Sequence, residues 1–357
     1  MSKLKPNLVR NLSVVALTAL VAAGCSSGAT TTPSSSPSGD ASPTSSGTAG
    51  TASPSASGPI TIALINKQGT QQYFVDQADG SKAAAAELGD VTVNVQDVQL
   101  DANAAINAIN TAIAQGVDGI IITVPDPKIG PEVIKLATAA GIPIMATNDT
   151  ISDADGTPAP YAGFSGFAMG QQVGEKAGEL YNESGWDATN TAVINIQKQD
   201  LPTCVERGQG ALAAFTETVG ADLPPVIDLG TDASAPQALD RTGAIVTANP
   251  DVKNWVVWGC NDESETGGVL ALKNAGFGAD NVIGVGLGAY LTCKDWKAGE
   301  VTGNKAALSL SGVEVGKLSV NLMVESLRDG TPLPEDSKVP TQIVDATNWE
   351  QAGVMCS

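Results

Sequence analysis

The chain has 357 residues, a net charge of −19 and no histidine. This length exceeds what one small core needs, so we expect two packed domains. The acidic balance, without a basic cluster beyond the first ten residues, argues against a nucleic-acid-binding surface. The absence of histidine removes Ser-His-Asp and Cys-His catalysis and any histidine-ligated metal, and so disfavours an enzyme.

The N-terminus has the three parts of an export signal. Lys3, Lys5 and Arg10 precede an apolar stretch, residues 12–23, that is too short to span a bilayer. The small residues of "AAGC" resemble a lipobox, which implies cleavage directly before Cys25 and a lipid on its sulfur. The alternative is an ordinary secretory signal with an incidental cysteine.

A tether is predicted next. Residues 26–58 contain only Ser, Thr, Pro, Gly and Ala, apart from Asp40. Such a segment has almost nothing to bury and cannot offset its chain entropy, so we expect it to be disordered. The rest of the chain is then expected outside the cytoplasm, lipid-anchored to the outer face of the cell membrane.

Four further cysteines fit two disulfides. An even number in an exported chain favours disulfides, and Cys204, Cys260, Cys293 and Cys356 allow three pairings among which the sequence does not choose. Their spacing contains no CxxC pair, so no zinc site is predicted. We predict no metal and no cofactor.

Apolar, β-branched runs alternate with helical patterns along the folded part. The expected strands are 60–66, 91–96, 119–125, 142–149, 191–197, 225–230, 254–259 and 281–288. The expected helices are 72–88, 102–115, 131–141, 207–219, 235–248 and 267–276. Strands alternating with helices indicate right-handed crossovers and parallel sheets, here in two units with a cleft between them.

Polar side chains cluster where these strands end. They are Asn66 and Lys67, residues 147–149, the loop 197–207 and the run "CNDESE" at 260–265. Ligands of open α/β sheets bind beyond the carboxyl ends of the strands, so these residues are candidates for a binding site. The alternative is that Asp149 and Asp262 only cap the following helices.

Several stretches resemble the periplasmic sugar-binding protein family, most closely its L-arabinose-binding branch. They are "INKQGTQQYF" (65–74), "TVPDPKIG" (123–130), "MATND" (145–149), "QVGEKAGELY" (172–181), "GWDATNTAVINI" (185–196), "GCNDESETGGVLALKNAGF" (259–277) and "VIGVGLG" (282–288). The resemblance covers residues 59 to about 351. It implies an α/β fold of the type I periplasmic binding protein class, with two Rossmann-like lobes joined by a three-strand hinge.

The resemblance also implies the domain boundaries. They are a lipoprotein signal peptide at 1–24, the lipidated Cys25 and tether at 25–58, an N-terminal sugar-binding lobe at 59–166 plus 309–336, and a C-terminal sugar-binding lobe at 167–308 plus 337–357. The three crossings between the lobes are expected near residues 166, 308 and 336.

Carried over position by position, the resemblance implies the ligand-binding residues. They are Lys67, Gln71, Tyr73, Phe74, Asn148, Asp149, Leu201, Thr203, Arg207 and Asn261. Two positions depart from the pattern, because Gly288 and Leu291 stand where the family has an asparagine and an aspartate. Tyr290, Gln71 and ordered water are candidates to compensate for that loss, or else the ligand differs from arabinose.

These residue types suit a sugar. Charged and amide groups satisfy its hydroxyls, with Asp149 accepting and Arg207 donating, while Tyr73 and Phe74 pack against a C–H face. Each also has a structural alternative: Lys67 could be a solvated strand end, the two aromatic residues could be core, and Arg207 could pair with Glu206.

The predicted function is a substrate-binding lipoprotein of an ABC-type monosaccharide importer. Its partners are a monosaccharide, the permease with its ATPase, and the membrane through the lipid anchor; no nucleic acid is expected, and the protein is expected to be a monomer. A receptor that passes a sugar or autoinducer signal is the alternative. A sugar-responsive repressor would need an N-terminal helix-turn-helix where the signal stands. A carbohydrate enzyme would need two facing carboxylates, for which Asp149 and Asp262 are the candidates.

Overall fold

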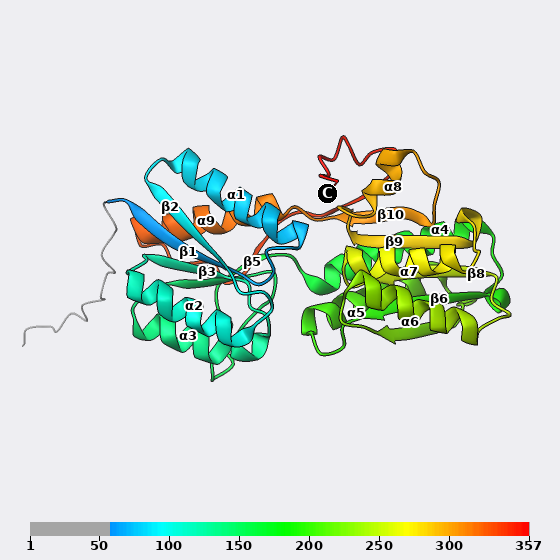
Figure 1. Cartoon of the computed structure of the whole chain (residues 1–357), viewed down its shortest axis with the longest axis horizontal. Coiled ribbons are helices and arrows are strands. Elements are labelled where there is room, and N and C mark those ends of the chain that lie inside the picture. Colours follow the sequence, from blue (N-terminus) through cyan, green and yellow to red (C-terminus); the bar gives the residue numbers. More distant parts are fainter. Residues whose placement is uncertain (1–57, 357) are drawn as a thin grey trace, which may run out of the picture. The chain divides into compact units, whose positions relative to one another are not determined.

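The computed structural model describes residues 58–356, which form two lobes, each built on one six-stranded sheet (Figure 1). The predicted signal peptide, Cys25 and all of the tether except residue 58 lie outside the described residues. The predicted α/β fold class is confirmed. Four strands were not predicted: β5 (Tyr161–Gly163), β10 (Asn304–Ser309) and the short edge strands β11 (Ser337–Lys338) and β12 (Gln342–Asp345). The helices α4 (Gly166–Ser184), α8 (Cys293–Ala298) and α9 (Gly312–Asp329) were not predicted either.

The first lobe contains the sheet ordered β11-β5-β4-β3-β1-β2. Its strands are β1 (Ile60–Asn66), β2 (Val91–Asp97), β3 (Gly119–Ile122), β4 (Ile144–Thr147), β5 (Tyr161–Gly163) and β11 (Ser337–Lys338). Its helices are α1 (Gln72–Leu88), α2 (Ala102–Gln115), α3 (Gly130–Ala139) and α9 (Gly312–Asp329), with a short 3-10 turn at Pro127–Ile129. All strand pairs of this sheet are parallel.

The second lobe contains the sheet ordered β12-β10-β9-β8-β6-β7. Its strands are β6 (Thr191–Gln197), β7 (Val226–Gly230), β8 (Asn254–Gly259), β9 (Val282–Gly288), β10 (Asn304–Ser309) and β12 (Gln342–Asp345). Its helices are α4 (Gly166–Ser184), α5 (Pro202–Val219), α6 (Ala235–Ala248), α7 (Asp262–Asn274) and α8 (Cys293–Ala298), with 3-10 turns at Ala188–Asn190 and Ala279–Asn281. The edge strand β12 runs antiparallel to β10, and the other pairs are parallel.

Helices cover both faces of each sheet. In the first lobe α1 and α9 pack on one face and α2 and α3 on the other (Figure 1). In the second lobe α4 and α5 cover one face, and α6 and α7 cover the other. Trp258, which strand alternation places toward the sheet interior, is 1% exposed and belongs to the core under α4 and α5.

The chain passes between the two sheets three times, after β5, after β10 and after β11. The third passage was expected near residue 336. Ser337 and Lys338 instead pair with β5 in the first sheet, so this passage follows Lys338. A strand of two residues is too short to show a hydrophobic pattern in the sequence.

Helix α5 begins earlier than predicted. It starts at Pro202, whereas the periodicity indicated a helix from 207. Proline at the first helical position has its φ already set for a helix and lacks an N–H that would stay unpaired there. As a result Thr203 and Arg207 project from a helix and not from a loop.

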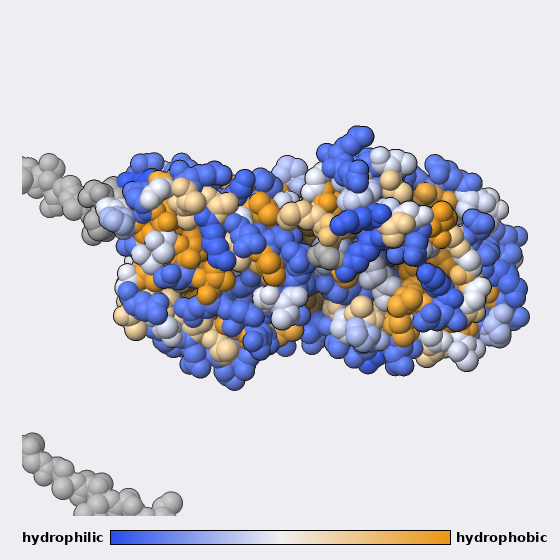
Figure 2. Space-filling model, turned by 45° about the horizontal axis from the view of Figure 1, so that its top comes forward, coloured by the Kyte–Doolittle hydropathy of each residue, from blue (hydrophilic) through white to orange (hydrophobic). Residues whose placement is uncertain are grey.

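The exposed large apolar side chains of the described residues belong to several separate elements, for example Phe167 on α4 and Leu270 on α7. In the view of Figure 2, hydrophobic side chains are interspersed with hydrophilic ones over both lobes. Scattered exposure of this kind is ordinary for folded proteins. Among residues 58–356, no helix is both long and apolar enough to cross a membrane.

Two helix pairs are held close by glycine. Gly170 and Gly174 of α4 face the α5 backbone, and a Cβ on Gly174 would collide with the carbonyl of Ala211. Gly80 of α1 meets α9 in the same way, against the backbone of Val313. A β-carbon at these positions would push the helices apart.

We expect Gly174→Ala to lower the free energy of unfolding by about 2–3 kcal/mol, because forcing extra volume into a packed contact strains the backbone. Gly243→Ala on α6 is the matched control, since a Cβ there meets nothing within 4 Å; it should be neutral or stabilise by about 0.5–1 kcal/mol. Chemical denaturation measures both, and equal effects would contradict the packing argument.

Candidate functional site

A cavity of about 510 Å³ lies at the carboxyl ends of the strands and is lined by residues of both lobes. All ten predicted residues line it: Lys67, Gln71, Tyr73, Phe74, Asn148, Asp149, Leu201, Thr203, Arg207 and Asn261. The other lining residues are Gln68, Thr70, Leu100, Pro125, Lys198, Cys204, Asp232, Ala233, Ser234, Ala235, Pro236, Glu263, Leu287, Tyr290 and Leu310. Gly288 and Leu291, the two departures from the family pattern, do not line it.

Asp149 is the centre of the first-lobe half of this site. Its side chain is fully buried, forms an ion pair with Lys67, and accepts from Thr203 Oγ1 at 2.8 Å and Asn148 Nδ2 at 2.9 Å. Asn148 has a left-handed φ of 62°, which asparagine tolerates, and this places the two side chains together after β4. Asp149 therefore does not cap a helix, and Lys67, 8% exposed, is not a solvated strand end.

The Asp149 carboxyl stays ionised. Burial alone would raise its pKa, but the Lys67 ammonium and the hydrogen bonds from Lys67, Thr203 and Asn148 outweigh burial and lower the pKa below its ordinary value. One carboxylate oxygen, Oδ1, receives only the Thr203 hydroxyl among the described residues, so it has a free lone pair for a ligand hydroxyl.

Two donors in the cavity wall have atoms without partners. Arg207 donates from Nη1 to the carbonyl of Cys260 at 2.7 Å, and its buried Nε has no partner among the described residues. The buried hydroxyl of Tyr73 also has none there, and burial raises the pKa of Tyr73. Unpaired buried donors cost free energy, so a ligand that accepts from them is stabilising. Arg207 does not pair with Glu206.

Tyr73 and Phe74 serve the core as well as the cavity. Their rings pack edge-to-face with centroids 5.0 Å apart and belong to the same apolar cluster as Phe164. Each ring is therefore buried by its neighbours and also borders the cavity, and its contact with a ligand stays a prediction.

Asn261, and not Asp262, caps the helix that follows β8. Asn261 is the N-cap of α7, where its Oδ1 accepts from the Ser264 N–H at 3.1 Å, while its Nδ2 donates to the Ala233 carbonyl at 2.9 Å. Asp262 does not cap the helix: it accepts from Leu291 N at 2.6 Å and Thr292 Oγ1 at 2.6 Å. Asp262 is buried away from the cavity, so it cannot face Asp149 as the second carboxylate of a hydrolase.

A second polar cluster joins the lobes inside the cavity. Gln71 of the first lobe donates from Nε2 to Glu263 Oε1 at 3.0 Å and to the Tyr290 hydroxyl at 3.1 Å. Tyr290 donates to Glu263 Oε2 at 2.8 Å. Glu263 belongs to the strand-end run 260–265 that the sequence marks as a candidate for the site, but it was not among the ten residues carried over from the family pattern.

The cysteines form Cys204–Cys260 and Cys293–Cys356. The first bond ties the first turn of α5 to the end of β8, directly beside Arg207 and Asn261. The second ties α8 to the C-terminal segment. Of the three pairings left open, this is the one that the fold selects.

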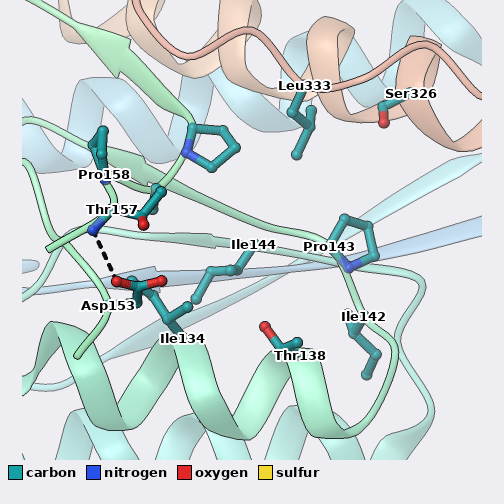
Figure 3. A pocket seen from close by; sticks show the side chains of 12 residues that line it. Ile134, Thr138, Ile142, Pro143, Ile144, Asp153, Thr157, Pro158, Ser326 and Leu333 are labelled. Carbon is teal, nitrogen blue, oxygen red and sulfur yellow. Dashed lines mark hydrogen bonds between the residues drawn. The ribbon is translucent and has the colours of Figure 1, made fainter. Parts of the chain in front are cut away.

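A second cavity, of about 320 Å³, lies at the amino end of β4 (Figure 3). Its wall is mainly apolar, with Ile134, Pro143 and Leu333, and its one carboxylate, Asp153, accepts from the Thr157 N–H at 2.8 Å. It lies away from the strand ends where ligands of this fold bind, so we do not assign it to the functional site.

The first turn of α7 also contains a buried acid, Glu265, that does not line the cavity. Glu265 is fully buried, and its nearest hydrogen-bonding group, Thr292 Oγ1, is 3.5 Å away. Burial, with the neighbouring charges of Asp262 and Asp295, raises the pKa of Glu265 well above 4.5.

A carboxyl with a raised folded-state pKa binds its proton more tightly in the folded chain. The free energy of unfolding should therefore fall as the pH rises above about 4.5, up to the folded-state pKa. Glu265→Gln cannot ionise and should flatten that slope in denaturation measured from pH 5 to 8. Glu300→Gln, an exposed carboxylate, is the control. An unchanged slope in Glu265→Gln would refute the assignment.

Two α/β lobes around a polar cavity at their strand ends define a bilobal binding protein. The chain belongs to the periplasmic binding protein family, whose domain model matches residues 62–331. The family resemblance predicted from the sequence is confirmed. The family and the relatives below are binding proteins, so this chain is a binding protein and not an enzyme.

Two relatives and one solved structure illustrate the similarity. The ABC transporter L-arabinose-binding periplasmic protein of Azospirillum brasilense is 27% identical over 297 residues, which is 82% of this chain and 88% of that protein. The L-arabinose-binding periplasmic protein of Escherichia coli K12 is 26% identical over 248 residues, 68% and 74% of the two chains. An ABC transporter solute-binding protein of Actinobacillus succinogenes, solved with bound D-allose, has a TM-score of 0.72 at 23% identity and covers 82% and 99%.

Proposed function

We propose that this protein is the extracytoplasmic substrate-binding lipoprotein of an ABC-type monosaccharide importer. It captures L-arabinose or a related pentose or hexose in the cavity between the lobes and delivers it to a membrane permease. It acts as a monomer, held to the membrane by a lipid on Cys25. The relatives named as L-arabinose-binding proteins of transporters support this role.

The observation that carries the proposal is the unsatisfied polar lining of the cavity. Arg207 Nε and the Tyr73 hydroxyl are buried donors without partners among the described residues, and Asp149 Oδ1 has a free lone pair. A sugar hydroxyl both donates and accepts, so a monosaccharide can satisfy all three groups at once. The rings of Tyr73 and Phe74 supply the apolar contact for a C–H face.

The charges of the lining favour a neutral ligand. Three cations (Lys67, Lys198 and Arg207) stand against three carboxylates (Asp149, Asp232 and Glu263), so their formal sum is zero. A ligand with a net charge would have no excess of opposite charge to bind. Neutral sugars meet this condition.

Binding is coupled to closure of the lobes about the three crossing segments. The site takes Asp149 from the first lobe and Thr203 and Arg207 from the second, so a ligand that contacts both lobes stabilises their approach. The closed form is the one that the permease accepts.

We expect at least one sugar to raise the melting temperature of the full chain in a thermal-shift screen. The panel contains L-arabinose, D-allose, D-galactose, D-xylose, D-ribose, D-fructose and D-glucose. Ligand at one hundred times its Kd should add about 2.7 kcal/mol to the free energy of unfolding. No shift with any of these sugars would count against a monosaccharide ligand.

Two variants should reduce the sugar-induced rise in melting temperature for different reasons. Asp149→Asn replaces the central carboxylate by a neutral amide and breaks the ion pair with Lys67, so it should abolish the shift. Tyr73→Phe removes a hydroxyl without a described partner, so the ligand-free melting temperature should hold while affinity falls about tenfold, the value of one hydrogen bond. Asp79→Asn, on the exposed face of α1, is the control and should change neither quantity.

The two disulfides provide a matched comparison. They close segments of 56 and 63 residues, so alanine replacement of either pair should cost about 4 kcal/mol of stability by the chain-entropy model. Only the pair Cys204→Ala, Cys260→Ala loosens the wall that holds Arg207, so only this double variant should also weaken sugar binding. Isothermal titration decides this, and equal loss of affinity in the Cys293, Cys356 pair would argue against a local role.

A further inference from the structure

Glu263 is a half-buried carboxylate in the cavity wall with a free capacity to accept. Its donors are Gln71 Nε2, the Tyr290 hydroxyl and its own backbone N–H, whereas a carboxylate can accept about four hydrogen bonds. Within residues 58–356 no lysine or arginine lies within ion-pair distance of it. The negative charge is therefore held by neutral donors alone.

The position of Glu263 distinguishes it from the other acids of α7. Asp262 and Glu265 are fully buried and do not line the cavity, whereas Glu263 and both of its partners do. If Glu263, Gln71 and Tyr290 only held the lobes together, they would not have to line the cavity. Glu263 places an acceptor there, on the second lobe.

Besides the exposed Asp232, the cavity thus contains two carboxylate acceptors, one on each lobe. Asp149 offers Oδ1 from the first lobe, and Glu263 offers its unused lone pairs from the second. Arg207 and Tyr73 supply the unpaired donors. A compact, neutral ligand with several hydroxyl groups can engage both acceptors, and the directions of its hydroxyls then decide which isomer fits.

We propose that Glu263, positioned by Gln71 and Tyr290, is a specificity-determining residue that accepts a hydrogen bond from one particular hydroxyl of the bound sugar. This inference rests on the proposed function and deepens it. Asp149 and Arg207 retain any sugar of suitable size, and Glu263 selects among stereoisomers. Gln71 and Tyr290 hold the carboxylate in the direction that reads this hydroxyl.

The test couples a substitution in the protein to a deletion in the ligand. The wild type and Glu263→Gln are titrated calorimetrically with the panel sugar that gives the largest thermal shift and with each of its monodeoxy analogues. Glu263→Gln should bind the parent sugar about tenfold more weakly, since a hydrogen bond to a charged group is lost. With one analogue, the one lacking the recognised hydroxyl, wild type and variant should bind equally.

Tyr290→Phe is the second variant. It should also bind the parent sugar more weakly than the wild type and bind the same analogue equally well, so it tests the inference even if Glu263→Gln fails to fold. Glu217→Gln, an exposed acid on α5, is the control and should match the wild type. Equal losses with every analogue would mean that Glu263 only holds the lobes together and would overturn the inference. Wild-type affinities in Glu263→Gln would overturn it too, leaving the proposed function intact. Failure of the wild type to bind any panel sugar would overturn both.

Discussion

The buried Lys67–Asp149 ion pair is the interaction on which the cleft depends. Desolvating two charges costs several kcal/mol, which attraction alone offsets only when further hydrogen bonds satisfy the pair. Asn148 supplies one such bond from the same lobe, and Thr203 supplies the other from the second lobe. The stabilisation of this buried pair therefore draws on both lobes.

The sheet topology explains why these residues meet. Both sheets contain the strand order 2-1-3-4-5 when each lobe is numbered from its own first strand, and this order opens a crevice beside the first strand. Lys67 follows β1, Asp149 follows β4, and Asn261 follows β8. Because parallel strands end at one edge, each lobe offers a row of strand-end side chains, and the cavity is bounded by two such rows.

Much of the fold and of the cavity lining could be predicted from the sequence, and what could not be predicted has physical causes. The buried strands and their polar ends were predicted because hydrophobic period and strand direction are local. The family resemblance then selected Lys67, Asp149 and Arg207 at those ends. The disulfide pairing, the role of Glu263 and the place of β11 were not, since each depends on which distant segments come together. The start of α5 was missed because Pro202 was not recognised as a first helical residue.

The first turn of α7 shows how one short polar run performs several tasks. Successive helical residues point about 100° apart, so neighbouring acids face different surroundings. Asn261 caps the helix, Asp262 holds the loop that carries Tyr290, and Glu263 receives the hydroxyl of that tyrosine in the cavity. A helix N-terminus favours negative charge, which helps this turn tolerate several acids. The residues that build the fold here thus also place a carboxylate in the cavity wall.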